Sequence, residues 1–260
     1  MSEAAISQGR RLTVRLADSG ADVANAQRLR YEIFFRSMGA LAPAGAGERD
    51  IDPYDELCDH LLVEDHGCSG TSVVGTYRLL RQSVAEAHHG FYSRHEFDLS
   101  KILAHGAREG FELLELGRSC VAPAYRDAVT IQLLWRGIAE YLQRHRIGYM
   151  FGCGSFHGTD PADHAEGLSL LAHDHLAPAD IRARAIGDEA IPLAMLPIGS
   201  YDPRLALRRL PPLIRAYLRV GAELGEGAYV DRLFNTIDVF VMMPVARISA
   251  RYAQRFEVAA

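Results

Sequence analysis

The stretch from Glu112 to Arg126 constrains the fold most, because it joins a buried strand, two ionisable groups and a loop that leads into a helix. The run from Leu113 to Leu116 is largely apolar, as expected of a buried strand. Glu115 and Arg118 interrupt it, and a buried charge is costly unless it is paired or used. A helical pattern starts near Thr130. Strand, short polar loop and helix in this order are typical of α/β proteins, which aim backbone N–H groups at an anionic or acyl ligand.

Apolar periodicity predicts alternating strands and helices along the chain. The expected strands are Arg11–Leu16, Leu61–Val63, Ser72–Leu80, Leu113–Leu116, Ile147–Gly152, Ile191–Leu196, Tyr229–Leu233 and Asp238–Met243. The expected helices are Asp22–Ser37 with Asp22 as N-cap, a short helix after Ser100, Thr130–Arg146, Asp163–His173, Pro178–Ala185, Leu213–Leu224 and Ala246–Arg255. Met38–Leu57 is expected to form a long loop, and Gln82–Ala107 is expected to combine a His-rich loop at His88-His89-Gly90 with the short helix after Ser100. The pattern shows no repeat and no clear domain boundary, so we expect one α/β domain.

Composition argues against several classes of function. The formal net charge of −5 gives no reason to expect nucleic-acid binding. The four cysteines have neither metal-ligand spacing nor a paired framework, and we expect reduced thiols in a cytoplasmic protein. No signal peptide is visible, and the apolar window Val239–Val245 is far shorter than the ~20 residues of a membrane span. His173 and His175 point in different directions on a helix, so no metal site is expected there.

Several short motifs occur in a fixed order along the chain. They are LRYEIF at residues 29–34, DIDPYD at 50–55, VVGTYRLL at 73–80 and ELGR at 115–118. This series resembles the acyl-carrier-protein-dependent branch of the GNAT acyltransferase superfamily, and acyl-homoserine-lactone synthases carry a related series. GFYS at 90–93 with EFDL at 96–99, and FNTIDV at 234–239, are similar to the bacterial L-ornithine N-alpha-acyltransferases, proteins that sometimes carry a hemolysin-like label. The resemblance runs from about residue 28 to about residue 252.

The resemblance implies a GNAT-like α/β (α+β) fold with a bent central mixed sheet flanked by helices. The core would span about 11–200 of the single domain 1–260, with a family-specific extension over about 201–260. It implies an N-acyltransferase that moves a 3-hydroxyacyl group from acyl carrier protein to the α-amine of L-ornithine. The product would be lyso-ornithine lipid, in the first step of ornithine lipid biosynthesis. The carrier would supply the phosphopantetheine arm, so no cofactor is expected.

One departure from the superfamily concerns the donor. The loop that cradles the pyrophosphate in CoA-using relatives is absent, and Ala124-Tyr125-Arg126-Asp127-Ala128 stands in its place. This fits a donor that has no nucleotide pyrophosphate.

N-acylation needs a free amine, a polarised thioester carbonyl and a path for one proton. Glu115 is the expected proton acceptor, because desolvation in an apolar strand would raise its pKa towards neutrality. The alternative is an ion pair of Glu115 with Arg118 or Arg78 that merely holds strands together.

The thioester oxygen needs a hydrogen-bond donor where negative charge develops. The backbone N–H groups of Cys120, Val121 and Ala122 are expected to supply it, because a bulged strand edge would free them. The thiol of Cys120 itself is expected to be structural.

The acceptor is a zwitterion with an extra ammonium, so its pocket should offer both arginine and carboxylate. Arg30 and Arg78 are expected to hold the carboxylate, and Asp52 and Asp55 to face the ammonium groups. A turn at Pro53-Tyr54 would aim both carboxylates inward; the alternative is that they are solvated loop acids. In the related synthases the positions associated with the active site match Arg30, Phe34, Asp52, Asp55, Arg78, Glu115 and Arg118.

Acyl carrier protein is acidic, so its docking site should be basic. A dense run of arginines near the C-terminus offers such a surface to the carrier or to an anionic membrane: Arg204, Arg208, Arg209, Arg215 and Arg219. A solvated helix face is the plainer alternative.

Three other functions stay open. The first is an acyl-homoserine-lactone synthase that uses S-adenosylmethionine. The second is an N-acyl amino acid synthase that acts on glycine, glutamine or lysine. The third is a module that binds the carrier protein or a membrane without catalysis.

Overall fold

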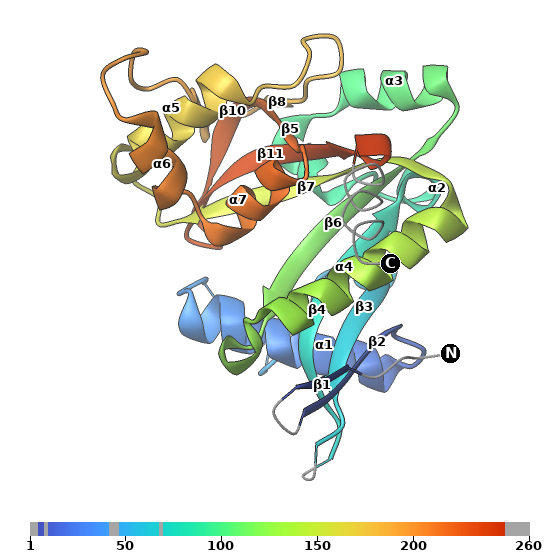
Figure 1. The fold of residues 1–260 in the computed structure, drawn as a ribbon. Coiled ribbons are helices and arrows are strands. Elements are labelled where there is room, and N and C mark those ends of the chain that lie inside the picture. The colour runs from blue at the N-terminus through green and yellow to red at the C-terminus, as the bar shows by residue number, and fades with distance from the viewer. Residues whose placement is uncertain (1–4, 8–9, 42–46, 68–69, 248–260) are drawn as a thin grey trace, which may run out of the picture. The chain divides into compact units, whose positions relative to one another are not determined.

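The computed structural model describes residues 5–7, 10–41, 47–67 and 70–247. Its contacts divide the chain into two compact units (Figure 1). The first comprises Met1–His88 and Glu115–Arg146, and the second comprises His89–Leu114 and Ile147–Ala260. The single domain over 1–260 with an extension from about 201 stays a prediction.

The first unit is built on a sheet of five strands. Their spatial order is β1 (Ala5–Ser7), β2 (Arg10–Leu16), β3 (Asp59–Asp65), β4 (Ser72–Arg81) and β6 (Glu112–Val121). The pairs β1–β2, β2–β3 and β3–β4 are antiparallel. The strands predicted in these regions are confirmed, because apolar runs bounded by turn residues leave little choice of structure.

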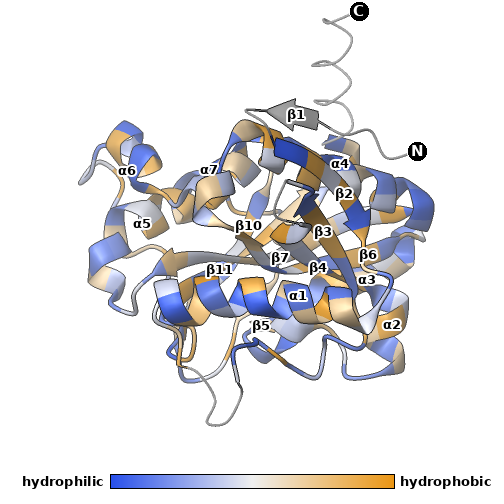
Figure 2. Cartoon of the chain, turned by 90° about the horizontal axis from the view of Figure 1, so that it is seen from below, coloured by the Kyte–Doolittle hydropathy of each residue, from blue (hydrophilic) through white to orange (hydrophobic). Residues whose placement is uncertain are grey.

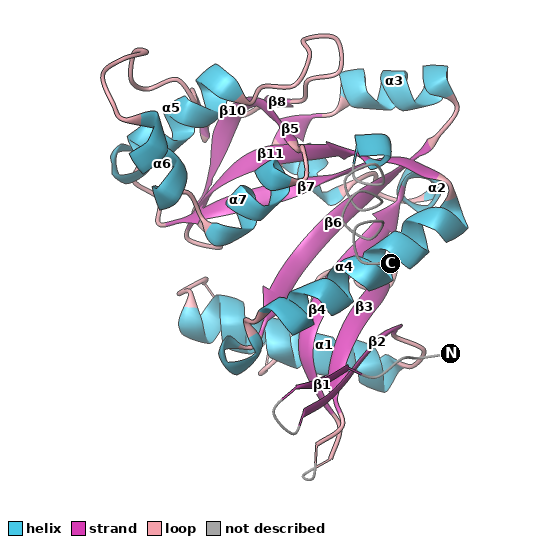
Figure 3. Ribbon diagram, viewed as in Figure 1, coloured by secondary structure: helices cyan, strands magenta, loops and turns pink. Residues whose placement is uncertain are grey.

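Helices α1 (Gly20–Tyr31) and α4 (Ala128–His145) cover opposite faces of this sheet (Figures 1 and 3). Alternation along the strands explains which side chains meet each helix. In β3, Leu61 faces α4, where a Cβ added to Gly137 would lie 2.7 Å from its Cδ1. His60 and its register partner Arg78 therefore face the α1 side. The unit also has α2 (Gln82–Ala87) and the 3₁₀ turn η3 (Pro123–Tyr125).

The start and end of α1 differ from the predicted helix Asp22–Ser37. Ser19 is the N-cap, because its Oγ accepts from the backbone N–H of Asp22 at 3.2 Å. The prediction of Asp22 as N-cap is wrong, since its carboxylate binds Arg15 at 2.6 and 2.9 Å. After Tyr31 the chain widens into a π-helical turn, η1 (Glu32–Ser37). Such turns occur frequently at functional sites.

The second unit holds a mixed sheet. Its order is β7 (Ile147–His157), β11 (Thr236–Pro244), β10 (Glu223–Asp231), β8 (Arg184–Ala185) and β5 (Phe97–Asp98), with β9 (Ala190–Ile191) also on β10. The pairs β7–β11 and β10–β11 are antiparallel, whereas β8 is parallel to β10. Its helices are α3 (Ser100–Glu109), α5 (Ala165–Asp174), α6 (Pro203–Arg209) and α7 (Pro212–Arg219), with 3₁₀ turns η2 (Tyr92–His95) and η4 (Pro161–His164).

Several predicted boundaries in this unit are wrong. Pro178–Ala185 is not a helix, because Ala183 and Ala185 extend along β10 and β5, where Ala183 accepts from the N–H of Glu226 at 2.8 Å. The strand predicted over Ile191–Leu196 is reduced to the two residues of β9. The helix predicted to Leu224 ends at Arg219, since Gly221, at φ +89°, turns the chain into β10.

Two further predictions lie at the margins of these units. The His-rich loop predicted at His88-His89-Gly90 is confirmed, and it follows α2, which was not predicted. Most of the helix predicted over Ala246–Arg255 lies outside the described residues. Within the described ranges, no helix is both long and apolar enough to cross a membrane.

Gly148 in β7 provides a test of packing in the second unit. A Cβ at this position would lie 2.2 Å from Cγ of Phe111, whose ring stacks on Tyr149 with centroids 5.4 Å apart. We expect Gly148→Ala to lower the free energy of unfolding by about 1–3 kcal/mol, because the added methyl group would overlap Cγ of Phe111 and displace the whole ring. Gly20→Ala is the control, since no heavy atom lies within 4 Å of the added Cβ. Urea unfolding of both variants checks this, and equal effects would contradict it.

Candidate active site

A buried cluster of three arginines and three aspartates occupies the α1 side of the first sheet. Arg30 comes from α1, Arg78 from β4 and Arg118 from β6, whereas Asp50, Asp52 and Asp55 come from the loop before β3. The helix contributes because its buried face carries polar side chains: Asp22, Gln27 and Arg30 are buried there together with Ala26, and hydrophilic and hydrophobic residues alternate along α1 in Figure 2. The six formal charges balance, as a buried ionic group requires.

Arg30 is the centre of the cluster. Its side chain is 1% exposed. Nε donates to Asp50 Oδ2 at 2.8 Å, and Nη1 and Nη2 donate to the two oxygens of Asp55 at 2.9 Å each. Nη2 also reaches the carbonyl of Asp50 at 2.5 Å, and Gln27 Nε2 donates to Asp55 Oδ2 at 2.9 Å. This fork-to-fork geometry is the strong form of an arginine–carboxylate pair.

Asp52, Arg78 and Arg118 form the outer part of the cluster. Arg78 Nη1 donates to Asp52 Oδ2 at 2.5 Å and to Asp55 Oδ1 at 3.2 Å. Arg118 donates to Asp52 Oδ2 from Nη2 at 3.0 Å and to Asp50 Oδ2 from Nε at 3.1 Å. The side chains of Asp52 and Arg118 are 15% and 11% exposed, against 4% for Asp55 and Arg78. Asp52 and Arg118 are therefore the most exposed members of the cluster.

The turn predicted at Pro53-Tyr54 is confirmed. The backbone N–H of Asp55 donates to the carbonyl of Asp52 at 3.1 Å, and the N–H of Tyr54 donates to Asp52 Oδ1 at 2.8 Å. The turn directs both carboxylates at the arginines. The alternative that Asp52 and Asp55 are solvated loop acids is therefore wrong.

Arg118 has an unusual backbone conformation, with φ +50°. Regular alternation would put Glu115 and Gly117 on one face of β6 and Arg118 on the other. Gly117 lies on the Arg78 face, because its added Cβ would meet Arg78 Nε at 3.6 Å. The left-handed residue breaks the alternation, so that Arg118 reaches the same aspartates. This conformation costs about 1–2 kcal/mol for a residue other than glycine.

The cluster controls the ionisation of its members. Burial alone would raise the pKa of the Asp55 carboxyl, but hydrogen bonds and charges from Arg30, with the charge of Arg78, hold that pKa well below its usual range. Burial lowers the pKa of His60, whose Nε2 lies 2.9 Å from the carbonyl of Asp55. Asp55 is therefore anionic and His60 is neutral at physiological pH.

Glu115 lies in β6 and is 5% exposed. Burial raises the pKa of the neighbouring Cys58 thiol to about 12, and the charges of Glu115, Asp52 and Asp55 contribute to this rise. Glu115 therefore shares the electrostatic environment of the cluster. Its role as proton acceptor stays a prediction.

The residues after Arg118 correct one expectation. The N–H of Ala122 donates to the carbonyl of Val74 at 2.8 Å, so this group is not available to a thioester oxygen. Cys120 and Val121 are buried, and donation from their N–H groups stays a prediction. Burial raises the pKa of Cys120 to about 12, which agrees with a structural thiol.

Phe34 is half-buried in the π-helical turn, one helical turn after Arg30, and its contact with a substrate stays a prediction. The predicted contact of Arg30 with a substrate carboxylate is also untested. Its guanidinium donates four hydrogen bonds within the chain, so the geometry favours a positioning role.

Sequence reasoning missed Asp50, Gln27 and His60. Asp50 opens the DIDPYD motif, and Gln27 precedes Arg30 by three residues on the same helix face. His60 carried no such signal, because its role depends on the pairing of β3 with β4.

The carboxylate of Asp52 and the guanidinium of Arg118 lie side by side at the partly exposed edge of the cluster. Such a pair can bind a zwitterion, and the electrostatically linked Glu115 can accept a proton from an amine.

The chain is similar to several known proteins. Residues 29–136 match the model of the acetyltransferase (GNAT) domain family. The chain is 45% identical to the L-ornithine N(alpha)-acyltransferase of Brucella abortus, over 93% of this chain and 87% of that protein. It is 40% identical to the enzyme of the same name from Rhodobacter capsulatus, over 93% of each.

Among solved structures, the chain is similar to FeeM, an N-acyl amino acid synthase from uncultured soil microbes, with a TM-score of 0.47 and 11% identity over 91% of this chain and 92% of that one. The predicted GNAT-like fold, a mixed sheet flanked by helices, is confirmed. The extent and identity of the first two relatives establish that the chain belongs to the L-ornithine N(alpha)-acyltransferase family.

Proposed function

We propose that this acyltransferase moves a 3-hydroxyacyl group from acyl carrier protein to the α-amine of L-ornithine. The observation that carries the proposal is the match over nearly the whole chain to relatives named for this acceptor. The product would be lyso-ornithine lipid, and the reaction would be the first step of ornithine lipid synthesis.

The exposed edge of the ion cluster would recognise the amino acid. Arg118 would hold the α-carboxylate, and Asp52 would accept from an ammonium group. Both side chains are positioned by partners that are themselves buried, Asp50 for Arg118 and Arg78 for Asp52. A pre-positioned pair loses little conformational entropy when the ligand binds.

The chemical step would be direct attack. The amine nitrogen adds to the thioester carbonyl, the C–S bond breaks, and the carrier's thiol leaves as the amide forms. Glu115 would take the proton that the amine must lose. The buried, high-pKa thiol of Cys120 agrees with a reaction that has no acyl-enzyme intermediate.

The start of α4 supports a donor without a nucleotide. Asp127 caps the helix, because its Oδ1 accepts from the N–H of Thr130 at 3.0 Å. Arg10 binds the other oxygen at 3.0 Å and lies over the ring of Tyr125, 4.4 Å from its centroid. A carboxylate thus occupies the helix end that would otherwise favour a phosphate. The phosphopantetheine arm would arrive on the carrier, and no resident cofactor is proposed.

Arginines on α6 and α7 would dock the acidic carrier. Arg204 and Arg208 are exposed on α6. Arg209 pairs with Glu166 at 2.8 Å and contributes less net charge, whereas Arg215 keeps its full charge and donates to the carbonyl of Arg208 at 2.9 Å. Anionic lipid head groups offer the same charge, and the amphiphilic product makes peripheral membrane contact part of the proposal.

The proposed reaction is tested by mass spectrometry of products. Purified protein is given 3-hydroxyacyl groups on carrier protein or on CoA, together with a panel of amino acids. We expect N-acylornithine, with kcat/KM at least about tenfold higher for the carrier donor, a difference of about 1.4 kcal/mol. Acylation of a different amine would contradict the acceptor, and equal use of CoA would contradict the donor.

Glu115→Gln tests the proton acceptor. We expect kcat/KM for ornithine to fall by about 10²- to 10⁴-fold, since the amide cannot accept the proton. Glu109→Gln, at an exposed site, is the matched control. Thermal unfolding shows whether Glu115→Gln remains folded. Full activity in a folded Glu115→Gln protein would rule out this role.

A further inference from the structure

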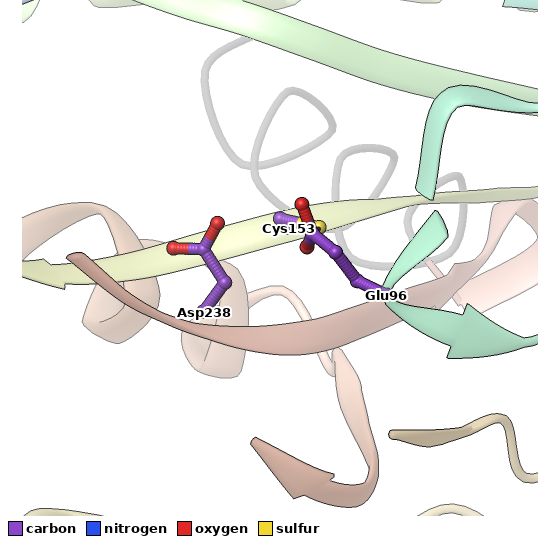
Figure 4. A group of neighbouring side chains, drawn as sticks. All are labelled: Glu96, Cys153 and Asp238. Atoms are coloured by element: carbon purple, nitrogen blue, oxygen red, sulfur yellow. Dashed lines mark hydrogen bonds between the residues drawn. The ribbon is translucent and has the colours of Figure 1, made fainter. Parts of the chain in front are cut away.

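Two features of the second unit have no role in the reaction proposed above. The first is a polar cluster of Glu96, Cys153 and Asp238 (Figure 4). Sγ of Cys153 donates to Oε2 of Glu96 at 3.3 Å, and all three side chains have further interactions. The cluster therefore indicates no ligand. The second feature is an exposed apolar turn at residues 195–200.

The turn is closed by a backbone hydrogen bond and carries an isoleucine at its tip. The N–H of Ser200 donates to the carbonyl of Pro197 at 3.2 Å, and Gly199 has φ +88°. A positive φ at the third position of such a turn selects glycine. Ile198 occupies the second position and is 81% exposed, the highest value for a large apolar side chain among the described residues. Met195 is 37% exposed, so the turn presents two apolar side chains to water.

Both ends of the turn are fixed on helix α5. Oγ of the buried Ser169 accepts from the N–H groups of Met195 and Leu196 at 3.0 and 2.9 Å. At the other end, the hydroxyl of Tyr201 shares a hydrogen bond of 2.9 Å with Nδ1 of His173. Ser169 and His173 are four residues apart, on one face of α5. Burying the apolar tip against the chain would break these hydrogen bonds.

The segment around the turn is basic, although the protein is acidic. Residues 190–222 contain five arginines and a single acidic residue, Asp202, whereas the formal net charge of the chain is −5. The carboxylate of Asp202 caps α6, where it accepts from the N–H groups of Arg204 and Leu205 at 2.8 and 3.3 Å. The uncharged turn is thus followed by a strongly basic segment, which is complementary to an anionic surface.

Helix α6 presents arginine and leucine together at its surface. Its buried residue is Ala206, and Arg204 and Arg208, two positions away on either side, lie on the opposite face of the helix. Both arginines are exposed, and Leu205 and Leu207 beside them are 40% and 41% exposed. Such a surface lets guanidinium groups meet lipid head groups while the apolar side chains enter the acyl boundary.

We propose that the turn at 195–200 and helix α6 form the surface by which this enzyme binds an anionic lipid bilayer. Ile198 would enter the acyl boundary, and Arg204 and Arg208 would bind the head groups. A turn of this size presents less surface than the roughly 800 Å² that a stable protein interface takes from each partner. A bilayer has no such requirement, because each inserted apolar side chain contributes separately.

The inference rests on the proposed function and deepens it, since it names the surface that brings the enzyme to the bilayer. The proposed product has one acyl chain and a charged head group, and such a molecule partitions into a bilayer. An enzyme bound there can release this product where it is stable. The inference also commits the arginines of α6 to lipid head groups rather than to the carrier, because the apolar turn that precedes them suits a bilayer.

Vesicle sedimentation of the full-length protein tests this surface. The vesicles are phosphatidylcholine alone or an equal mixture of phosphatidylcholine and phosphatidylglycerol, and we expect tighter binding to the mixture. Ile198→Ser should weaken that binding about fivefold or more, and combined Arg204→Ala and Arg208→Ala about tenfold or more. Leu233→Ser is the matched control and should bind like the native protein. Leu233 is also apolar and 48% exposed in the second unit, but it lies in the turn between β10 and β11.

A tryptophan at the tip reports insertion directly. In Ile198→Trp, emission of the introduced indole should shift to shorter wavelength when anionic vesicles are added, because the ring moves from water into the membrane interface. The native chain has one tryptophan, Trp135, which is 9% exposed and contributes little to such a change. Leu233→Trp is the control and should keep the emission of an indole in water.

Three outcomes would overturn the inference. The first is an Ile198→Trp emission that does not shift with anionic vesicles, or an Ile198→Ser protein that binds them like the native one. The second is an emission shift with acyl carrier protein instead of vesicles, which would assign the tip to the carrier. The third is a native dimer in sedimentation velocity that Ile198→Ser abolishes, which would assign the tip to a second copy of the chain.

The vesicle experiments do not depend on turnover, so the two proposals fail separately. A protein that binds vesicles through Ile198 but makes no N-acylornithine refutes the proposed function alone. A protein that makes N-acylornithine without binding vesicles refutes only the membrane surface.

Discussion

The buried pairing of Arg30 with Asp50 and Asp55 is the interaction on which the rest of the candidate site depends. These three side chains are at most 5% exposed, and the guanidinium donates to both carboxylates. Removing one partner of such a pair costs about 3–5 kcal/mol, because an uncompensated charge stays buried. The pairing fixes the loop that carries Asp52 against α1 and the sheet. Without this pairing, burial of the loop's carboxylates would be unfavourable, and the loop would expose them to water.

The residues around this centre have two different roles, positioning and contact with the acceptor. Arg30, Asp50 and Asp55 are satisfied by one another and by Gln27, so their contribution is to position the rest. Asp52 and Arg118 stand at the exposed edge. The left-handed conformation at Arg118 is unfavourable by about 1–2 kcal/mol. The hydrogen bonds of its guanidinium to Asp50 and Asp52 offset that cost. Strain held in place by a buried network is typical of sites where a side chain must be aimed.

Much of the fold could be predicted from local sequence signals. The apolar runs at Leu61–Val63 and Asp238–Met243 define strands, and the apolar helical pattern over Thr130–Arg146 predicts α4, which begins two residues earlier, at Ala128. Local signals failed where tertiary contacts decide. Asp22 has the chemistry of an N-cap but binds Arg15. Ala183 is extended because its carbonyl accepts a hydrogen bond from the N–H of Glu226 in β10.

The site could be predicted only in part, because its motifs are local in sequence but its contacts are not. The DIDPYD turn and the ELGR strand identified Asp52, Asp55 and Arg118 through the resemblance. The resemblance could not show that the hydrogen-bond donors of Arg30 are used by partners within the chain, or that the N–H of Ala122 donates to the carbonyl of Val74.

The central claim is that the buried part of the cluster supports the structure and its exposed edge binds the acceptor. The most direct test measures KM for ornithine and the free energy of unfolding in Asp52→Asn and Asp55→Asn. The account predicts that Asp55→Asn loses about 3–5 kcal/mol of stability, whereas Asp52→Asn loses clearly less and raises KM about tenfold or more, or about 1.4 kcal/mol in binding. An Asp52→Asn protein with unchanged KM, or one as unstable as Asp55→Asn, would contradict the account.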